Sequence, residues 1–452
     1  MESLYQHFAH VLERHYQSRA SHCSNGKLVL AFSGGIDSRV LLELLRHYQH
    51  THSVPCQAVY VHHGLSDNAD VWADKCLHWA KQAGIPCMIE YVNLDIHSGE
   101  SIELLARQAR YKALQQYIEQ GDILLTGQHA DDQVETLLLA LKRGSGPKGL
   151  SSMPESMPFA KGSLVRPLLT IQRQHIERFA QQFCLEWVED ESNQDTRYDR
   201  NFLRHRVIPQ LVQRWPSFHQ AVQRSAHLCA EQEQLLDELL DSAFQQAIHP
   251  DGSLCLSILS THSALVRLRL IRMWLSMMEV MMPSRIQLGL IWSEVALAQQ
   301  DANPKLQLKQ GEIRRFQNRL YWLGPRTDLT DWYASLQLDI PLLLPDSLGE
   351  LLFSSTSEQA NLILPEEPDL LKVTFNPEGL SAHPTTRSRG RKLKKLFQEY
   401  HIPSWQRRQL PIVMYQGQVV AVAGLFVDRA FSGHQCELIW HQSDSVRLIN
   451  EP

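Results

Sequence analysis

Short apolar runs alternate with longer stretches of helical spacing between residues 28 and 143. The apolar runs predict buried strands at 28–32, 58–61, 88–92 and 123–126. Apolar residues three or four positions apart predict helices at 38–47, 67–82, 101–117 and 131–142. Strands and helices in this order form parallel sheets that are covered by helices on both faces. The sequence therefore predicts an α/β fold with a parallel doubly wound sheet, in which ligands bind at the carboxyl ends of the strands.

The pattern changes after residue 143. Residues 150–214 extend the first domain with a helix near 172–184, residues 217–300 are almost wholly helical, and residues 305–323 have a strand-like pattern. Several prolines in 324–370 indicate a loosely organised connector, and apolar runs at 373–375 and 419–423 flank a basic helix. We therefore predict an α/β domain at 1–214, a mostly helical domain at 215–325, a connector at 326–370 and a small α+β domain at 371–452.

Composition narrows the class of protein. A hydrophobic fraction of 43% and a charged fraction of 21% exclude disorder across the whole chain. The formal net charge of −5 excludes a uniformly basic nucleic-acid coat but allows a basic surface on one domain. No stretch approaches the ~18 apolar residues of a membrane span, and the N-terminus has no secretory pattern. We therefore expect a cytoplasmic protein without membrane contact. The eight cysteines include no Cys-x-x-Cys pair and no zinc-finger spacing.

The string Ser33-Gly34-Gly35-Ile36-Asp37-Ser38 lies between the first predicted strand and helix. Two glycines let the backbone approach an anion closely, and the start of the helix presents N–H groups and a positive dipole. Ser33 and Ser38 add hydroxyl donors, and the Asp37 carboxylate is suited to Mg²⁺ on a phosphate. A glycine turn with a Ser or Asp helix cap is the alternative interpretation. The spacing is neither that of a Walker A loop nor Gly-x-Gly-x-x-Gly.

This string resembles the pyrophosphate loop of the ATP pyrophosphatase superfamily. The resemblance implies cleavage of ATP between its α and β phosphates, and for most members adenylation of a substrate oxygen. The same resemblance implies that residues 33–38 bind the nucleotide. The loop alone does not choose among asparagine, argininosuccinate, GMP and NAD synthetases and several tRNA-modifying enzymes.

Further strings narrow the choice of family. They are His62–Leu65, Ala106–Tyr111, Gly127–Thr136, Arg143–Gly146, Glu189–Asn193 and Tyr198–His205, with Phe375, Pro377–Gly379, Lys392–Glu399 and Ala423–Leu425 near the C-terminus. Together they resemble the bacterial tRNA(Ile)-lysidine synthetases over nearly the whole chain. One departure is Thr385-Thr386 after His383-Pro384, where a glycine is expected near the following arginine.

The resemblance implies a two-step ligation. ATP adenylates O2 of the wobble cytidine in a tRNA(Ile) with a CAU anticodon, and pyrophosphate leaves. The ε-amine of free L-lysine then attacks C2 and expels AMP, which yields lysidine and changes the codon read from AUG to AUA. In this family residues 1–214 correspond to the catalytic domain, 215–325 to a tRNA-orienting domain and 371–452 to a tRNA-binding domain. The resemblance leaves a homodimer open.

The residues fit that chemistry. A cationic lysine needs acidic contacts, and Asp131, Asp132 and Glu135 lie at or near the start of one predicted helix. Asp132 and Glu135 share a helix face, and a nearby carboxylate can accept the proton of the amine. Acidic residues also cap helix starts without any substrate, which is the alternative interpretation.

Two further groups have weaker signals. His63, with His62, is expected in the adenine pocket and Arg110, with Arg107, on ATP phosphates or RNA. Structural histidines and a solvated helix face are the alternatives.

Residues 387–408 contain eight basic residues and one acidic residue, Glu399, which leaves the rest of the chain strongly acidic. This asymmetry predicts a phosphate-binding face, with Arg389, Lys392, Lys394 and Lys395 as tRNA contacts. Tyr400 and Trp405 are candidates for stacking on bases. Arg204 belongs to a second basic region, residues 197–214, which is expected at the anticodon stem. A merely solvated charged face is the alternative for both regions.

Three rival functions remain. A tRNA thiolase normally needs a Cys-x-x-Cys pair, which the chain lacks. An ammonia-using synthetase often carries a glutaminase domain, and no nucleophile signature for one is present. A non-catalytic tRNA-binding protein has no need of the intact Ser33, Asp37 and Ser38.

Overall fold

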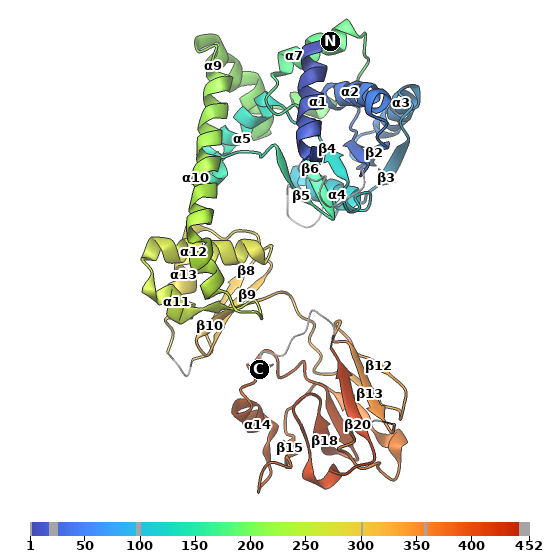
Figure 1. Cartoon of the computed structure of the whole chain (residues 1–452), viewed down its shortest axis with the longest axis vertical. Coiled ribbons are helices and arrows are strands. Elements are labelled where there is room, and N and C mark those ends of the chain that lie inside the picture. The colour runs from blue at the N-terminus through green and yellow to red at the C-terminus, as the bar shows by residue number, and fades with distance from the viewer. Residues whose placement is uncertain (1, 18–25, 96–100, 300–301, 357–358, 443–452) are drawn as a thin grey trace. The chain divides into compact units, whose positions relative to one another are not determined.

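The computed structural model describes residues 2–17, 26–95, 101–299, 302–356 and 359–442 (Figure 1). The chain divides into two compact units, Met1–Leu236 and Asp237–Pro452. The division falls inside the long helix α10 (Phe218–Ala247), whereas the sequence predicted a domain boundary at residues 214 and 215.

The first unit is built on a six-stranded sheet of order β3-β2-β1-β4-β6-β5. The strands are β1 (Leu28–Ala31), β2 (Cys56–His62), β3 (Cys87–Tyr91), β4 (Ile123–Leu125), β5 (Ser156–Phe159) and β6 (Gly162–Val165). The first four strands were predicted, and they are parallel. The pair β5 and β6 was not predicted, because each strand has four residues and β5 contains Pro158. The edge strand β5 is antiparallel to β6, so the sheet is mixed rather than wholly parallel.

The helices of this unit are α1 (Glu2–Gln17), α2 (Ile36–His52), α3 (Ala69–Gln82), α4 (Ile102–Gln115), α5 (Ala130–Lys142), α6 (Pro147–Leu150), α7 (Arg173–Gln182), α8 (Asp199–Phe202), α9 (Ile208–Arg214) and the first part of α10. Short turns at Glu191–Gln194 and Leu203–Val207 join the last of them, and the second turn is π-helical. Ser101 caps α4, since its Oγ accepts the N–H of Leu104 at 3.3 Å. Asp67 does not begin α3 as predicted, because residues 66–68 form a turn that the Ala69 N–H closes on the Ser66 carbonyl at 3.1 Å.

Alternate residues of the central strand pack on opposite faces of the sheet. Leu28 and Leu30 belong to a core that also includes residues of α1, α2 and α7. Val29 belongs to a smaller core on the other face, with Leu114 of α4. This alternation matches the period of two along a strand, and it confirms the predicted cover on both faces (Figure 1).

The strand order places the site. β1 lies between β2 and β4, so the chain leaves β1 toward one side of the sheet and returns at β4 on the other. At such a reversal the loops after the two strands diverge and leave a crevice at their carboxyl ends. The loops concerned are residues 32–35 after β1 and residues 126–129 after β4.

The second unit begins with a helical part and a small sheet. Its elements are the end of α10, β7 (Leu254–Cys255), α11 (Leu256–Thr261), α12 (Ala264–Met277), α13 (Arg285–Leu290) with a π-helical extension at Ile291–Ala296, β8 (Lys305–Leu308), β9 (Gly311–Phe316) and β10 (Arg319–Leu323). The sheet order is β7-β10-β9-β8, and the side chains of Trp274, Ile271 and Ile313 form its core. The helical and strand-like patterns predicted here are confirmed. Among the described residues, no helix combines the length and the apolar character needed to cross a membrane.

The remainder of the second unit is mostly β. Its elements are β11 (Tyr333–Ser335), β12 (Leu342–Leu343), β13 (Glu350–Ser354), β14 (Lys372–Thr374), β15 (Ser381–Ala382), β16 (Arg391–Lys392), α14 (Leu393–Glu399), β17 (Ile412–Tyr415), β18 (Gln418–Val422), β19 (Phe426–Val427) and β20 (Glu437–His441), with single turns at Pro368–Leu370 and Arg429–Phe431. The predicted strands around a basic helix are present as β14, α14 and β18.

The prediction of a loosely organised connector at 326–370 is wrong. In that segment β11 pairs with β14, and β13 pairs with β20 over five residues. Leu336 and Phe353 are fully buried in the same core as Val373. The sequence suggested a linker for two reasons. The segment contains several prolines, and its strands are only two to five residues long, which is too short for a pattern to be recognised. A fragment that begins at residue 371 would therefore lack β11, β12 and β13, of which β11 and β13 pair with strands that the fragment keeps.

Candidate active site

The loop after β1 is held in a conformation that requires one glycine. Gly34 has φ +78°, and a Cβ there would lie 2.8 Å from Sγ of Cys76. The Val188 N–H donates to the Gly34 carbonyl at 2.9 Å, so a distant segment fixes the loop. Gly35 has an ordinary φ of −67°, and a Cβ there would meet only the Ser33 hydroxyl, at 3.7 Å. The second glycine therefore leaves open space beside the backbone, which an anion can approach.

The serines and the helix start complete this loop. The buried Ser38 hydroxyl donates to the Gly35 carbonyl at 2.9 Å and accepts the Ser33 N–H at 3.2 Å. Ser38 thus shapes the loop with its side chain, while Ser33 is exposed. The N–H groups of Ile36, Asp37 and Ser38 precede the first helical hydrogen bond of α2, which Arg39 donates to Gly35 at 2.9 Å. They are the donors that a helix start offers to an anion.

Asp37 lies next to this start, with 25% of its side chain exposed. Nη1 of Arg173, the first residue of α7, donates to its two carboxylate oxygens at 3.0 and 2.8 Å. Burial raises the pKa of Asp37 above its ordinary value, although the charges of His129 and Arg173 oppose that rise. A cation bound between Asp37 and a phosphate would therefore share this carboxylate with Arg173.

Asp131 follows β4 and accepts hydrogen bonds from two other helices. Its Oδ2 accepts the backbone N–H of Arg173 at 2.9 Å, and its Oδ1 accepts Nε2–H of His219 in α10 at 3.0 Å. Burial alone would raise the pKa of Asp131, but hydrogen bonds from His129, His219 and the Arg173 N–H hold it well below its ordinary value. Asp131 is therefore an ionised carboxylate that connects three segments.

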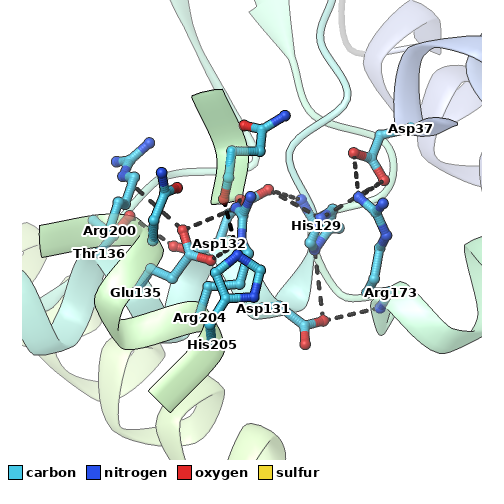
Figure 2. A network of polar contacts seen from close by, with 12 residues as sticks. Asp37, His129, Asp131, Asp132, Glu135, Thr136, Arg173, Arg200, Arg204 and His205 are labelled. Carbon is cyan, nitrogen blue, oxygen red and sulfur yellow. Dashed lines mark hydrogen bonds and ion pairs between the residues drawn. The ribbon is translucent and has the colours of Figure 1, made fainter. Parts of the chain in front are cut away.

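Asp132 and Glu135 share a contact with Arg204 on their common side of α5, and Nε of Arg200 lies 4.0 Å from Oε2 of Glu135 (Figure 2). Nε and Nη2 of Arg204 donate to the two oxygens of Glu135 at 2.7 and 3.1 Å, and Nη2 donates to Oδ1 of Asp132 at 3.2 Å. Glu135 is fully buried. Burial raises the pKa of Glu135, and Arg204 opposes that effect. The sequence had assigned Arg204 to the RNA, whereas its guanidinium lies here on the acidic residues.

Asp132 also caps its helix. Its Oδ2 accepts the N–H of His129 at 2.9 Å, so the capping interpretation that the sequence left open holds for this residue. Oδ1 is the oxygen that accepts from Arg204, so capping and the contact with Arg204 use different oxygens of one carboxylate.

His129 joins the loop after β1 to the acidic turn after β4 (Figure 2). Its Nε2 lies 3.7 Å from Oδ1 of Asp37 and 3.5 Å from Oδ2 of Asp132, and its Nδ1 lies 3.5 Å from Oδ2 of Asp131. Burial would lower the pKa of this histidine, but the surrounding carboxylates, Asp132 most strongly, raise it to about 9. The ring is therefore a buried cation at neutral pH.

This raised pKa predicts a pH-dependent stability. Because the pKa is about 9 in the folded protein and about 6.5 in an unfolded chain, the stabilisation by His129 is complete below pH 6.5. It is lost as the pH rises toward 9. We expect the difference in free energy of unfolding between the wild type and His129→Gln to shrink over that interval. Urea denaturation of both proteins at several pH values measures it, and a constant difference would contradict the assignment.

His63 and Arg110 form a separate contact. Nε of Arg110 in α4 donates to Nε2 of His63, after β2, at 3.4 Å. Burial, with a smaller effect of Arg110, lowers the pKa of His63 to about 4, so this ring is neutral. Within the described residues, no hydrogen bond or ion pair joins this pair to Asp37 or Asp132. Arg107 stacks on Tyr111, with its guanidinium 5.0 Å from the ring centre.

The basic segment of the C-terminal part separates into paired and exposed residues. Arg387 and Arg391 both pair with Glu399. Arg389, Lys392, Lys394 and Lys395 are exposed. The two aromatic candidates for base stacking are packed within the protein: the rings of Tyr400 and Phe426 are 5.5 Å apart, and those of Trp405 and Tyr321 are also 5.5 Å apart.

Sequence reasoning gave no role to three site residues, which are His129, Arg173 and His219. Arg173 and His219 come from α7 and α10, and neither belongs to a motif with a recognised spacing. His129 was part of a recognised string but received no role. Its place directly before two aspartates at a strand end was the signal that could have found it.

A glycine loop after the first strand of an α/β sheet, joined to acidic residues after the fourth, defines the class of PP-loop ATP-binding enzymes. The family described as "PP-loop domain" matches residues 4–211. Two further families match downstream, "TilS substrate binding domain" at 254–321 and "TilS substrate C-terminal domain" at 371–443.

Full-length relatives name the family. A tRNA(Ile)-lysidine synthase of Vibrio parahaemolyticus is 69% identical, with 98% of this chain and all of the relative covered. One of Vibrio cholerae (El Tor Inaba N16961) is 54% identical, with 99% and 100% covered. A U34-tRNA thiolase of Methanococcus maripaludis matches 51% of this chain and 78% of its own, at 18% identity and a TM-score of 0.41. The chain belongs to the tRNA(Ile)-lysidine synthase family, and it is an ATP-dependent ligase. The predicted family and fold class are confirmed.

Proposed function

We propose that the protein joins free L-lysine to C2 of the wobble cytidine of a tRNA(Ile) with a CAU anticodon. One observation carries this proposal: His129 and Arg173 connect Asp37, beside the nucleotide loop, with the acidic residues at the start of α5. The residues proposed for phosphate activation are thus adjacent to those proposed for the cationic amine. The names of the relatives in the family support the same substrates.

In the first step, O2 of cytidine attacks the α-phosphorus of ATP and pyrophosphate leaves. Ser33, Gly34, Gly35 and the N–H groups of Ile36, Asp37 and Ser38 would hold the phosphates. Mg²⁺ is normally held by one or two carboxylates together with substrate phosphates. Asp37 fits that arrangement, and the ion would offset the charge of the phosphates. His63 and Arg110 remain proposed contacts of the nucleotide, with the neutral ring of His63 suited to a base.

In the second step, the ε-amine of lysine attacks C2 and AMP leaves with the electrons of the C2–O2 bond. Asp132 and Glu135 would hold the ammonium group before it loses a proton. Because burial raises the pKa of Glu135, this carboxyl is the better proton acceptor of the two. Arg204 now occupies both carboxylates, so lysine must displace its guanidinium, and contact with the phosphates of the anticodon stem is a means of drawing it away.

The decisive experiment is the transfer of labelled lysine to RNA. Enzyme, ATP, labelled lysine and a tRNA with a CAU anticodon should yield labelled tRNA together with AMP and pyrophosphate in equal amounts. A tRNA with the wobble cytidine replaced by uridine is the matched control. ATP consumption without label in the RNA would overturn the assignment of lysine.

We also propose a cytoplasmic location, where tRNA and ATP are available. The family resemblance leaves a homodimer open, and light scattering would test for it.

Replacing Lys392, Lys394 and Lys395 together with alanine is expected to weaken tRNA binding. All three side chains are exposed, and each phosphate contact contributes about −0.7 to −0.9 to the slope of log K against log salt. The slope should therefore become less steep by about 2, with an unchanged KM for ATP. Filter binding across a salt series measures it. The control removes two exposed lysines of α3, Lys75 and Lys81, and an equal slope in both variants would contradict the assignment.

A further inference from the structure

His219 is a buried histidine that the reaction described above does not use. It is the second residue of α10, and 6% of its surface is exposed. Its Nε2 lies 3.0 Å from Oδ1 of Asp131. A carboxylate only accepts hydrogen bonds, so Nε2 carries the proton. Within the described residues Nδ1 is buried and has no partner, so the single hydrogen bond of this ring goes to Asp131.

That hydrogen bond fixes the orientation of the Asp131 carboxylate. One oxygen, Oδ1, faces His219, while Oδ2 accepts the Arg173 N–H at 2.9 Å and lies 3.5 Å from Nδ1 of His129. The donors come from α7, α10 and the residue before α5. A carboxylate that is held on both oxygens cannot turn about its Cβ–Cγ bond. Removal of the His219 donor would free that rotation.

The groups beyond Asp131 face the nucleotide loop. Arg173 contacts Asp37 through Nη1, and the Nε2 of His129 lies between Asp37 and Asp132. Asp131 helps to fix both residues, because its Oδ2 accepts the backbone N–H of Arg173 and lies 3.5 Å from Nδ1 of the His129 ring. Among the described residues, no hydrogen bond or ion pair joins His219 to Asp37, Arg173 or His129, so its effect on them passes through Asp131.

A histidine at this position needs an explanation, because burial of a polar ring is costly without a hydrogen bond. An apolar side chain in place of His219 would avoid that cost. Within the described residues, the hydrogen bond to Asp131 is the gain that the imidazole provides over such a side chain.

We propose that His219 is a positioning residue of the ATP-dependent step, which acts through Asp131 to hold His129 and Arg173 against Asp37. The proposal rests on the proposed function only for pyrophosphate release, and it is independent of which amine attacks afterwards.

The test compares two amides of different reach. In His219→Gln the amide nitrogen takes the place of Nε2, whereas in His219→Asn it is one bond too short. Loss of a partner that orients a metal ligand typically costs about 10–100-fold, and we expect an effect of that order for the partner of Asp131. We expect kcat for tRNA-dependent pyrophosphate release to fall at least about tenfold in His219→Asn and to stay within about threefold in His219→Gln. KM for ATP should change by less than about twofold in both. His227→Asn, an exposed histidine of the same helix, is the matched control.

A merely structural role predicts a different result. Thermal unfolding of both amide variants separates lost stability from lost positioning. In an Asp131→Ala background the difference between His219→Asn and His219→Gln should vanish, because the acceptor of the hydrogen bond is gone. Equal kcat in the two amide variants, or a difference that persists with Asp131→Ala, would overturn the proposal. Labelled-lysine transfer by the wild type tests the proposed function separately.

Discussion

Replacement of Asp37 with alanine is expected to abolish pyrophosphate release, with kcat lowered at least about 1,000-fold, because a catalytic metal ion stabilises developing charge by several kcal/mol. The carboxylate lies beside the start of α2, and its pKa is raised by burial. A bound cation would reverse that effect and hold the group ionised. In the variant, Arg173 keeps its other partner, Glu177, at 3.0 Å. We therefore expect the fold and tRNA binding to survive.

Three measurements separate these expectations. Pyrophosphate release in single turnover reports the chemical step, filter binding reports the affinity for tRNA, and thermal unfolding reports stability. Asp74→Ala, which removes an exposed carboxylate of α3, should be indistinguishable from the wild type in all three. Near-normal turnover of Asp37→Ala would remove this carboxylate from the mechanism, and a parallel loss of tRNA binding would reassign it to the RNA.

The α/β core could be predicted from the sequence because its central strands are buried on both faces. Runs such as Leu28–Ala31 and Ile123–Leu125 are continuous and apolar, so they stand out against the helical spacing between them. The strands of the 326–370 segment are different. β12 has two residues and β11 has three, which is too short for a period to be recognised. The pairing of β11 with β14, and of β13 with β20, depends on residues far away in the sequence.

The candidate site also has parts that the sequence could predict and parts that it could not. The nucleotide loop and the acidic turn are local strings, so the sequence could place them at the ends of neighbouring strands. The partners of these strings could not be predicted, because Arg173, Arg204 and His219 reach them from helices far along the chain. From the local sequence we predicted that Asp132 and Glu135 contact the ammonium group of free lysine. The fold supplies a guanidinium instead, and that contact changes what the acidic residues must do during the reaction.

Replacement of Glu135 with glutamine is expected to lower kcat/KM for lysine at least about 30-fold, because removal of one partner from a buried charge pair costs about 2–5 kcal/mol. Glutamine keeps the shape of the side chain and removes its charge. Pyrophosphate release in the absence of lysine should change much less, since Glu135 contacts Arg204 rather than the nucleotide loop. Steady-state kinetics with varied lysine, beside single-turnover pyrophosphate release, measures the two steps separately.

Arg204→Gln decides what the Glu135 result means. If Glu135 binds the substrate ammonium, the double variant should use lysine less well than Arg204→Gln alone, because a second contact of the amine is lost. If Glu135 serves only to hold Arg204, the double variant should be no worse than the single one, since the pair has already been broken. The burial of Glu135 makes this distinction strict: no exposed surface of the carboxyl is available to lysine until the arginine moves. If Glu135 binds the ammonium, lysine must compete with Arg204 for this carboxylate, and Arg204→Gln should then lower KM for lysine.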